Sequence, residues 1–93
     1  MSTKIVYNKS FGGFSLSPLA REALQKLGIN DEYEVQRHDS RLVEVIEKLG
    51  GFANGPFANL DIWYLKGKKY IIEEYDGKES VIEPEDLKWV EVK

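Results

Sequence analysis

The chain contains no cysteine, and this is the feature that most constrains how its 93 residues can fold. Disulfide bonds, cysteine-bearing zinc sites and thiol catalysis are all excluded, so noncovalent packing has to hold the fold. A chain of this length supports only one core, and a single domain over residues 1–93 is expected. Its hydrophobic fraction of 42% suffices for that core. His38 is the only histidine, and neither a metal site nor a cofactor is expected.

The charge balance limits the classes of partner. Lysine and arginine number 13 against 16 aspartates and glutamates, for a net charge of −3. A protein that binds nucleic acid by neutralising phosphates needs the opposite balance, so generic nucleic-acid binding is not expected. No apolar run approaches the roughly 20 residues that span a bilayer, and no hydrophobic signal segment follows Met1. We therefore expect no membrane partner and a cytoplasmic protein.

The first half of the chain carries the start signals of two helices. Ser17 before Pro18 indicates the first start, because proline at the first helical position lacks only an N–H that is unpaired there. The second helix is predicted to begin at Asp39 or Ser40, either of which can cap it. Apolar residues recur at helical spacing after each start, so both helices are expected to lie on a core.

Strand signals account for most of the remaining chain. Asp76-Gly77 is the strongest, since both residues tolerate the positive φ of a two-residue hairpin turn. The sequence predicts an α+β fold in which two helices pack on one face of a mainly antiparallel sheet of four to five strands. The expected strands are 4–8, 60–65, 70–75 and 79–82, with 60–65 and 70–75 as antiparallel neighbours, and two short stretches, 33–35 and 88–92, are optional additions to them.

A glycine turn separates the first strand from the first helix and is a candidate ligand site. Gly12 and Gly13 let a ligand approach the backbone, and the N–H groups of a helix start favour an anion. Phe14 adds a flat apolar surface and Ser15 a hydroxyl donor, which together suit a ligand with a ring and a phosphate or carboxylate. A tight strand-to-helix turn explains the same glycines without any ligand.

The start of the second helix is also rich in donors. Arg37 supplies a forked donor for phosphate or carboxylate, and His38 can donate near neutral pH. If the two helix starts face one another, Asn8 and the glycine turn converge with them on one cleft. Asn54 and Glu74 are candidate polar partners of the ligand. A solvated turn is the alternative interpretation of Arg37 and His38.

Carboxylates in the second half of the chain indicate a different kind of site. Alternation along a strand places neighbouring carboxylates on opposite faces, which disfavours a catalytic or metal-binding pair. A surface for a protein partner is the interpretation that remains. A small hydrolase that uses His38 and Asp39 is a third alternative. The clustered carboxylates are Glu73, Glu74, Asp76, Glu79, Glu83, Glu85 and Asp86.

Six strings of the sequence stand out together: KIVYNK at 4–9, FGGFSLS at 11–17, RHD at 37–39, LVEVIEKLG at 42–50, ANG at 53–55 and EYDG at 74–77. With these strings the chain resembles a family of small uncharacterised proteins carried by tailed bacteriophages and prophages. The resemblance extends over most of the chain, and Ser40 stands where that family often has a proline. The resemblance implies a phage origin and expression in the bacterial cytoplasm, and it transfers no catalytic residue.

Two functional hypotheses follow from the motifs and the resemblance together. The first is a phage-encoded, non-enzymatic binding protein that forms a homo-oligomer. It would sequester a phosphate-bearing, nucleotide-derived immune signal of the host at the donor-rich helix starts. The second is an acidic protein-interaction module that inhibits a host defence protein through its carboxylates.

Overall fold

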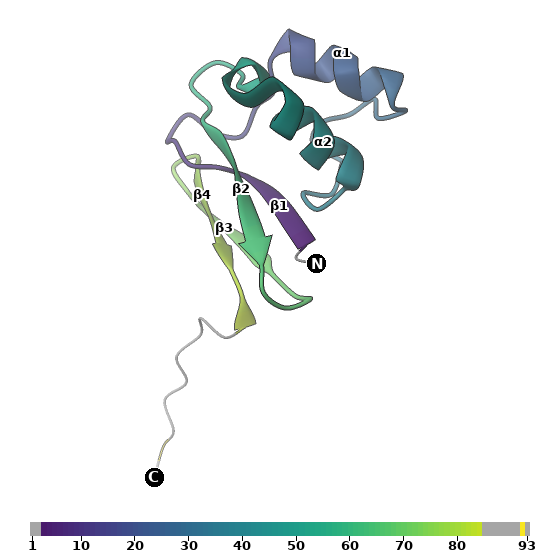
Figure 1. Ribbon diagram of the computed structural model, residues 1–93. Coiled ribbons are helices and arrows are strands. Elements are labelled where there is room, and N and C mark those ends of the chain that lie inside the picture. Colours follow the sequence, from purple (N-terminus) through teal and green to yellow (C-terminus); the bar gives the residue numbers. More distant parts are fainter. Residues whose placement is uncertain (1–2, 85–91, 93) are drawn as a thin grey trace.

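The computed structural model describes residues 3–84 and residue 92 (Figure 1). Two helices and four strands follow one another, with a short 3-10 helix between α2 and β2. The elements are β1 (Thr3–Asn8), α1 (Pro18–Lys26), α2 (Ser40–Leu49), the 3-10 helix (Gly50–Ala53), β2 (Leu60–Leu65), β3 (Ile71–Tyr75) and β4 (Lys78–Ile82).

Both predicted helix starts are confirmed. The Ser17 hydroxyl accepts a hydrogen bond of 3.1 Å from the N–H of Ala20, and Pro18 is the first helical residue of α1. At α2 the Asp39 carboxylate accepts a hydrogen bond of 2.9 Å from the N–H of Arg41. Each cap satisfies one of the amides that a helix leaves unpaired at its start.

The extended stretch predicted at 33–35 is wrong. These residues form a turn in which the Asp31 carboxylate accepts a hydrogen bond of 2.8 Å from the N–H of Tyr33. An aspartate side chain that bonds two residues ahead imitates a backbone turn and competes with extended structure. The last predicted strand, 88–92, lies outside the described residues except for Val92.

The α+β class is confirmed, but the single sheet of four to five strands is wrong. β1 pairs antiparallel with β2 from Thr3 opposite Leu65 to Asn8 opposite Leu60. β3 pairs antiparallel with β4 across the Asp76-Gly77 turn, and the two pairs form separate two-stranded sheets. The predicted pairing of 60–65 with 70–75 is therefore also wrong, because β2 takes β1 as its partner instead.

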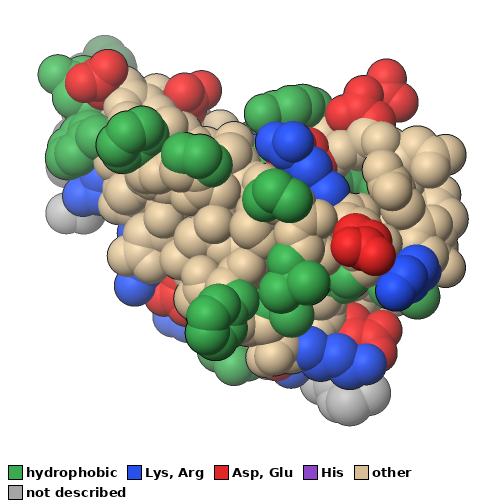
Figure 2. Space-filling model, turned by 90° about the horizontal axis from the view of Figure 1, so that it is seen from above, with side chains coloured by type: hydrophobic (Ala, Val, Ile, Leu, Met, Phe, Trp, Pro, Cys, Tyr) green, Lys and Arg blue, Asp and Glu red, His purple; other side chains and the backbone are tan. Residues whose placement is uncertain are grey.

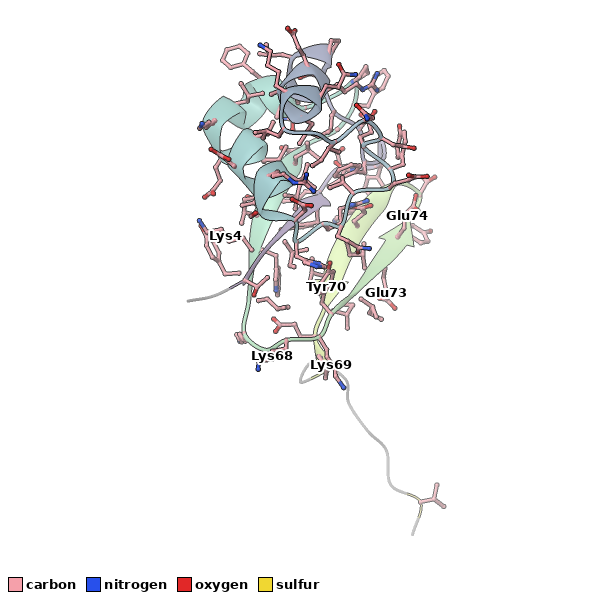
Figure 3. The ribbon with its side chains drawn as sticks, turned by 90° about the vertical axis from the view of Figure 1, so that its right-hand side faces the viewer. Lys4, Lys68, Lys69, Tyr70, Glu73 and Glu74 are labelled. Atoms are coloured by element: carbon pink, nitrogen blue, oxygen red, sulfur yellow. The ribbon has the colours of Figure 1, made fainter. Side chains whose placement is uncertain are left out.

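The β1–β2 pair lies between the helices and the β3–β4 hairpin, which together give the fold three layers (Figures 1 and 3). Successive residues of a strand point to opposite faces, and β1 buries both Ile5 and Val6 completely. Val6 joins the apolar cluster under the helices, whereas Ile5 joins Leu65 and Val81 under the hairpin. Both faces of the β1–β2 pair carry apolar side chains, so a second layer has to pack on each face. The helices cover one face and the β3–β4 hairpin covers the other, which is why the hairpin does not join β1 and β2 in a single sheet.

Glu83 fastens the open end of the hairpin to the central layer. Its buried carboxylate accepts hydrogen bonds from the Trp63 indole at 3.1 Å and from the N–H groups of Lys66 and Gly67 at 2.9 and 3.2 Å. Burial alone raises the pKa of Glu83, but these bonds to the charged form outweigh it and lower that pKa below its ordinary value. Within the described residues no helix is long and apolar enough to cross a membrane.

Candidate functional site

Asn8 organises the end of the molecule at which β1 and the hairpin turn meet. Its side chain is fully buried, and its amide nitrogen donates to the carbonyls of Ser10 and Gly77 at 2.8 and 2.9 Å. Its side-chain oxygen accepts from the N–H groups of Ser10 and Asn59 at 3.3 and 2.8 Å. One side chain therefore ties the end of β1 to the start of β2 and to the tip of the hairpin.

Arg37 and Glu79 form a second tie along the free edge of β1. The guanidinium makes a two-pronged contact with the buried carboxylate at 2.6 and 2.8 Å, and the same carboxylate accepts the Asn8 N–H at 3.0 Å. The Phe14 ring lies 3.7 Å from the guanidinium carbon. The backbone carbonyl of Arg37 accepts a hydrogen bond of 2.9 Å from the N–H of Val6, and the guanidinium donates one of 3.3 Å to the carbonyl of Val6. The guanidinium of Arg37 therefore makes its hydrogen bonds within the fold.

The glycine turn packs against other parts of the chain. A side chain on Gly12 would overlap Phe57, and one on Gly77 would overlap the backbone of Phe11 and Gly13. Gly55 is equally close to Ser15, whose hydroxyl lies 3.5 Å from the carbonyl of Pro56. These glycines allow backbone segments to approach each other closely, which is the structural use of glycine.

Seven of the nine predicted site residues lie around this network, and two lie elsewhere. Asn54 accepts the N–H of Leu60 at 2.8 Å and so joins the network through β2. His38 bonds through Nδ1 to the Tyr70 hydroxyl at 2.7 Å, near the opposite end of the central layer. Glu74 is exposed on β3, as Figure 3 shows. The seven residues at the network are Asn8, Gly12, Gly13, Phe14, Ser15, Arg37 and Asn54.

His38 and Asp39, the pair considered for hydrolysis, have different partners. Both Asp39 carboxylate oxygens accept from the Arg41 side chain, at 3.1 and 2.8 Å, while His38 contacts Tyr70. The hydrogen bonds from the side chain and backbone of Arg41 lower the pKa of Asp39 to about 2. Among the described residues, no group of three histidine or carboxylate side chains could hold a metal ion.

Four hollows formed by the described residues lie away from the glycine turn. One groove of about 630 Å³ runs between β1 and α2, and His38, Lys4 and Glu47 line it. Another of about 480 Å³ lies at the open end of the hairpin. Four cavities stand out in the described part of the chain, and His38 is the one predicted site residue that lines any of them.

Exposed aromatic side chains surround the Asn8 network, and the sequence analysis missed them as a group. The side chains of Phe11, Phe57 and Tyr75 are 60%, 85% and 79% exposed. Phe57 packs beside Gly12, while Lys78 lies opposite Tyr75 in the hairpin and holds its ammonium 5.5 Å from the Phe11 ring. We call these three side chains the aromatic loop end.

The backbone of Phe57 sets the aromatic loop end apart from ordinary exposed residues. Its φ is 65°, a left-handed conformation that is uncommon for a bulky residue and costs about 1–2 kcal/mol. The Ser10 hydroxyl donates to the Phe57 carbonyl and holds this conformation.

Hydrophobic side chains on the face seen in Figure 2 occur in separate groups among charged ones. Pro56 before Phe57 was the available sequence signal, since it marks a turn.

Comparison with known proteins gives no further guide to the site. No protein-family model, curated protein or solved structure matches the chain.

Proposed function

We propose that the chain is a small non-enzymatic binding protein whose aromatic loop end docks onto a protein partner. The observation that carries this proposal is the left-handed backbone of Phe57, which directs a ring that is 85% exposed into solvent. Backbone strain persists where the surroundings impose it, and such positions concentrate at functional sites. Tyrosine and phenylalanine are also enriched where protein partners bury surface.

The buried network beneath the aromatic loop end supports this proposal. Asn8 fixes the turn of the hairpin, and Gly12 fixes the position of Phe57. Three rings on an immobilised backbone lose little conformational entropy when a partner covers them. Rigid presentation of aromatic side chains is the arrangement expected of a docking surface rather than of a self-packing loop.

The charge around the aromatic loop end favours a basic partner. Glu73, Glu74 and Asp76 are exposed on β3 and its turn, and they outnumber Lys78, whose ammonium lies beside Phe11. Glu79 and Glu83 are buried and hydrogen-bonded, so they do not add to the acidic surface. Glu85 and Asp86 lie outside the described residues. We propose a partner surface that combines an apolar hollow with lysine or arginine at its rim, and the phage resemblance directs the search to bacterial host proteins.

The phosphate-ligand hypothesis stays a prediction, and the contacts of Arg37 weigh against it. A phosphate at Arg37 would have to compete with the Glu79 carboxylate, which makes two short bonds with the guanidinium in a largely buried setting. Breaking such a pair leaves a buried charge without its partner, at about 3–5 kcal/mol. The hypothesis is tested by mass spectrometry of small molecules released from protein that has been incubated with bacterial lysate and then denatured.

The docking proposal is tested with matched aromatic variants. Phe57→Gly removes the ring, and glycine accepts the positive φ, so the fold should be kept. Tagged wild type, Phe57→Gly and the control Tyr33→Ser, a ring that is also exposed but lies on the turn between α1 and α2, are used to capture proteins from bacterial lysate. A captured protein is then purified and titrated with each variant.

We expect Phe57→Gly to weaken binding of the purified partner at least tenfold and Tyr33→Ser to leave it unchanged. Equal binding by wild type and Phe57→Gly would contradict the proposal, as would a loss of binding with Tyr33→Ser alone. Because the carboxylates of β3 are expected to attract a basic partner, added salt should screen that attraction and weaken the association.

A further inference from the structure

The outer edge of β3 has no strand beside it. One edge of β3 pairs with β4, and no other strand within residues 3–84 pairs with the opposite edge. Figure 3 shows Glu73 and Glu74 on β3 at the margin of the molecule. A free edge presents unpaired N–H and C=O groups and is a ready template for another strand.

The hairpin turn determines which backbone groups face this edge. Asp76 and Gly77 have φ of 52° and 91°, as a two-residue type I′ turn requires. Such a turn is closed by a bond between its flanking residues, Tyr75 and Lys78, and bonding alternates along an antiparallel ladder from there. The N–H and C=O groups of Ile72 therefore point to the free edge, and an added strand has to match this phase.

The charges along this edge are complementary to those of an antiparallel copy of the same segment. Lys68 and Lys69 precede the strand, and Glu73 and Glu74 lie in its second half. An antiparallel copy centred on Ile71 places Lys69 opposite Glu73 and Lys68 opposite Glu74. This register also matches the hydrogen-bonding pattern of the edge. It places Ile72 opposite an even-numbered residue of the copy, and the backbone groups of even-numbered residues are the ones that point to the free edge. Opposite charges across antiparallel strands stabilise the pairing, whereas like charges oppose it.

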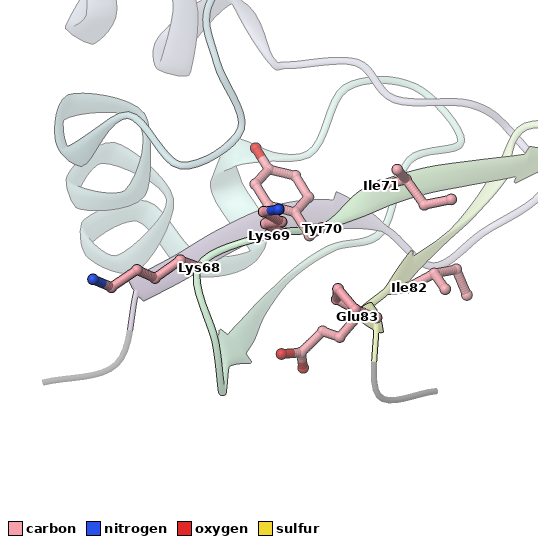
Figure 4. Close-up of a pocket in the computed structure, with 7 residues that line it drawn as sticks. Lys68, Lys69, Tyr70, Ile71, Ile82 and Glu83 are labelled. Carbon is pink, nitrogen blue, oxygen red and sulfur yellow. The ribbon is translucent and has the colours of Figure 1, made fainter. Parts of the chain in front are cut away.

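Apolar surface beside the edge has the same symmetry. Ile71 is 57% exposed and lies opposite Ile82 on the outer face of the hairpin. Both side chains line the hollow of about 480 Å³ at the open end of the hairpin, next to Lys69 (Figure 4). A copy centred on Ile71 would set two Ile71 side chains against each other and form a row of four isoleucines across four strands.

We propose that β3 binds the β3 of a second copy of this chain, antiparallel and centred on Ile71. The two hairpins then form one four-stranded sheet in the order β4, β3, β3, β4, related by a two-fold axis, which is the usual symmetry of protein dimers. This dimer can be tested separately from the proposed docking of the aromatic loop end, because Phe11 and Phe57 are not part of the edge and Tyr75, although it is on β3, lies beyond the charge pairs of this register.

Charge exchange tests the pairing. Wild type is expected to show a concentration-dependent dimer in sedimentation equilibrium. Lys69→Glu and Glu73→Lys each place like charges opposite one another, so each alone should raise the dimer dissociation constant at least tenfold. An equimolar mixture of the two restores opposite charges and should form the heterodimer. Glu34→Lys makes the same change in net charge as Glu73→Lys, on an exposed site away from the hairpin, and should dimerise like wild type.

A single introduced cysteine tests the register, since the chain has none of its own. Residues that face each other in a non-hydrogen-bonded pair have Cα atoms about 4.5 Å apart, which is within the range of a disulfide. Ile71→Cys should therefore give a disulfide-linked dimer with a mild oxidant such as diamide. Ser80→Cys, on the same face of the hairpin but in β4, should stay monomeric under the same conditions.

Three outcomes would overturn the proposal. The first is a wild-type protein that stays monomeric at every concentration. The second is a dimer that both charge variants leave intact, since its interface would then lie elsewhere. The third is disulfide formation by Ser80→Cys but not by Ile71→Cys, because another register or surface would then join the copies. Circular dichroism of each variant confirms that the exposed substitutions leave the fold unchanged.

Discussion

Replacing Asn8, which lies in the buried network beneath the aromatic loop end, with alanine should strongly destabilise the fold. The substitution removes five hydrogen bonds, two donated to the carbonyls of Ser10 and Gly77 and three accepted from the N–H and hydroxyl of Ser10 and the N–H of Asn59. Each such bond contributes about 1 kcal/mol net, so the expected loss of unfolding free energy is about 4–5 kcal/mol. This is a large part of the roughly 5–15 kcal/mol that stabilises an ordinary domain.

The measurement is urea unfolding followed by tryptophan fluorescence, with the slope of the transition compared between variants. Asn30→Ala is the matched control, because Asn30 is exposed and its loss should change the free energy by less than about 0.5 kcal/mol. An unchanged slope would show that Asn8→Ala alters stability and not the size of the cooperative unit.

Asn8→Asp separates hydrogen bonding from the space that the side chain fills. The carboxylate has the same shape, but it turns an oxygen toward the carbonyls of Ser10 and Gly77 where wild type has a donor. Burial should raise the pKa of this introduced carboxyl. Its deficit against wild type is then largest at neutral pH and shrinks as the pH falls toward the ordinary aspartate value of about 3.9.

A loss below about 1 kcal/mol for Asn8→Ala would refute this reasoning. So would an Asn8→Asp deficit that does not depend on pH. Either result would mean that water replaces the side chain at these contacts, and that the hairpin tip is held in place by other contacts.

Three further predictions concern the hairpin contact, the strained backbone and the cap of α2. Arg37→Ala should cost about 3–5 kcal/mol in urea unfolding because it leaves Glu79 buried without its partner, whereas replacing both residues with apolar ones should cost less. Phe57→Gly should change the free energy of unfolding by less than about 1 kcal/mol, since the relief of strain offsets the added freedom of the unfolded chain. Asp39→Asn should lower the melting temperature at neutral pH. Because Arg41 lowers the pKa of Asp39 from 3.8 to about 2, this difference should shrink as the pH falls from about 4 to about 2.

Local signals in the sequence predicted the helices and the hairpin correctly. Ser17 before Pro18, Asp39 before α2 and the Asp76-Gly77 turn each act within a few residues, so their partners are close in the chain. The predicted sheet failed because strand partners were assigned by proximity in sequence. β2 carries apolar residues on both faces, and this was the signal that it would lie between two layers.

The candidate site shows a similar limit. The sequence identified Gly12 and Gly13 as places of close backbone approach, and the structure has such an approach at Gly12. A glycine pattern does not distinguish a ligand from another segment of the same chain, however, because both need only the missing side chain. Arg37 was likewise found as a strong donor, but its acceptor, Glu79, is far away in the sequence and close only after folding.

The pairing of β1 with β2 also sets the order in which the chain can fold. β1 is made first, yet its partner residues follow both helices, so the strand has to wait for most of the chain before it can form its ladder. At roughly 5–20 residues per second, a ribosome needs several seconds to produce β2 after β1. The β3–β4 hairpin, in contrast, closes through a two-residue turn within about 1–10 μs of its completion. Synthesis of this protein therefore leaves an unpaired apolar strand at the N-terminal end for seconds, and that interval is when binding by a chaperone would matter most.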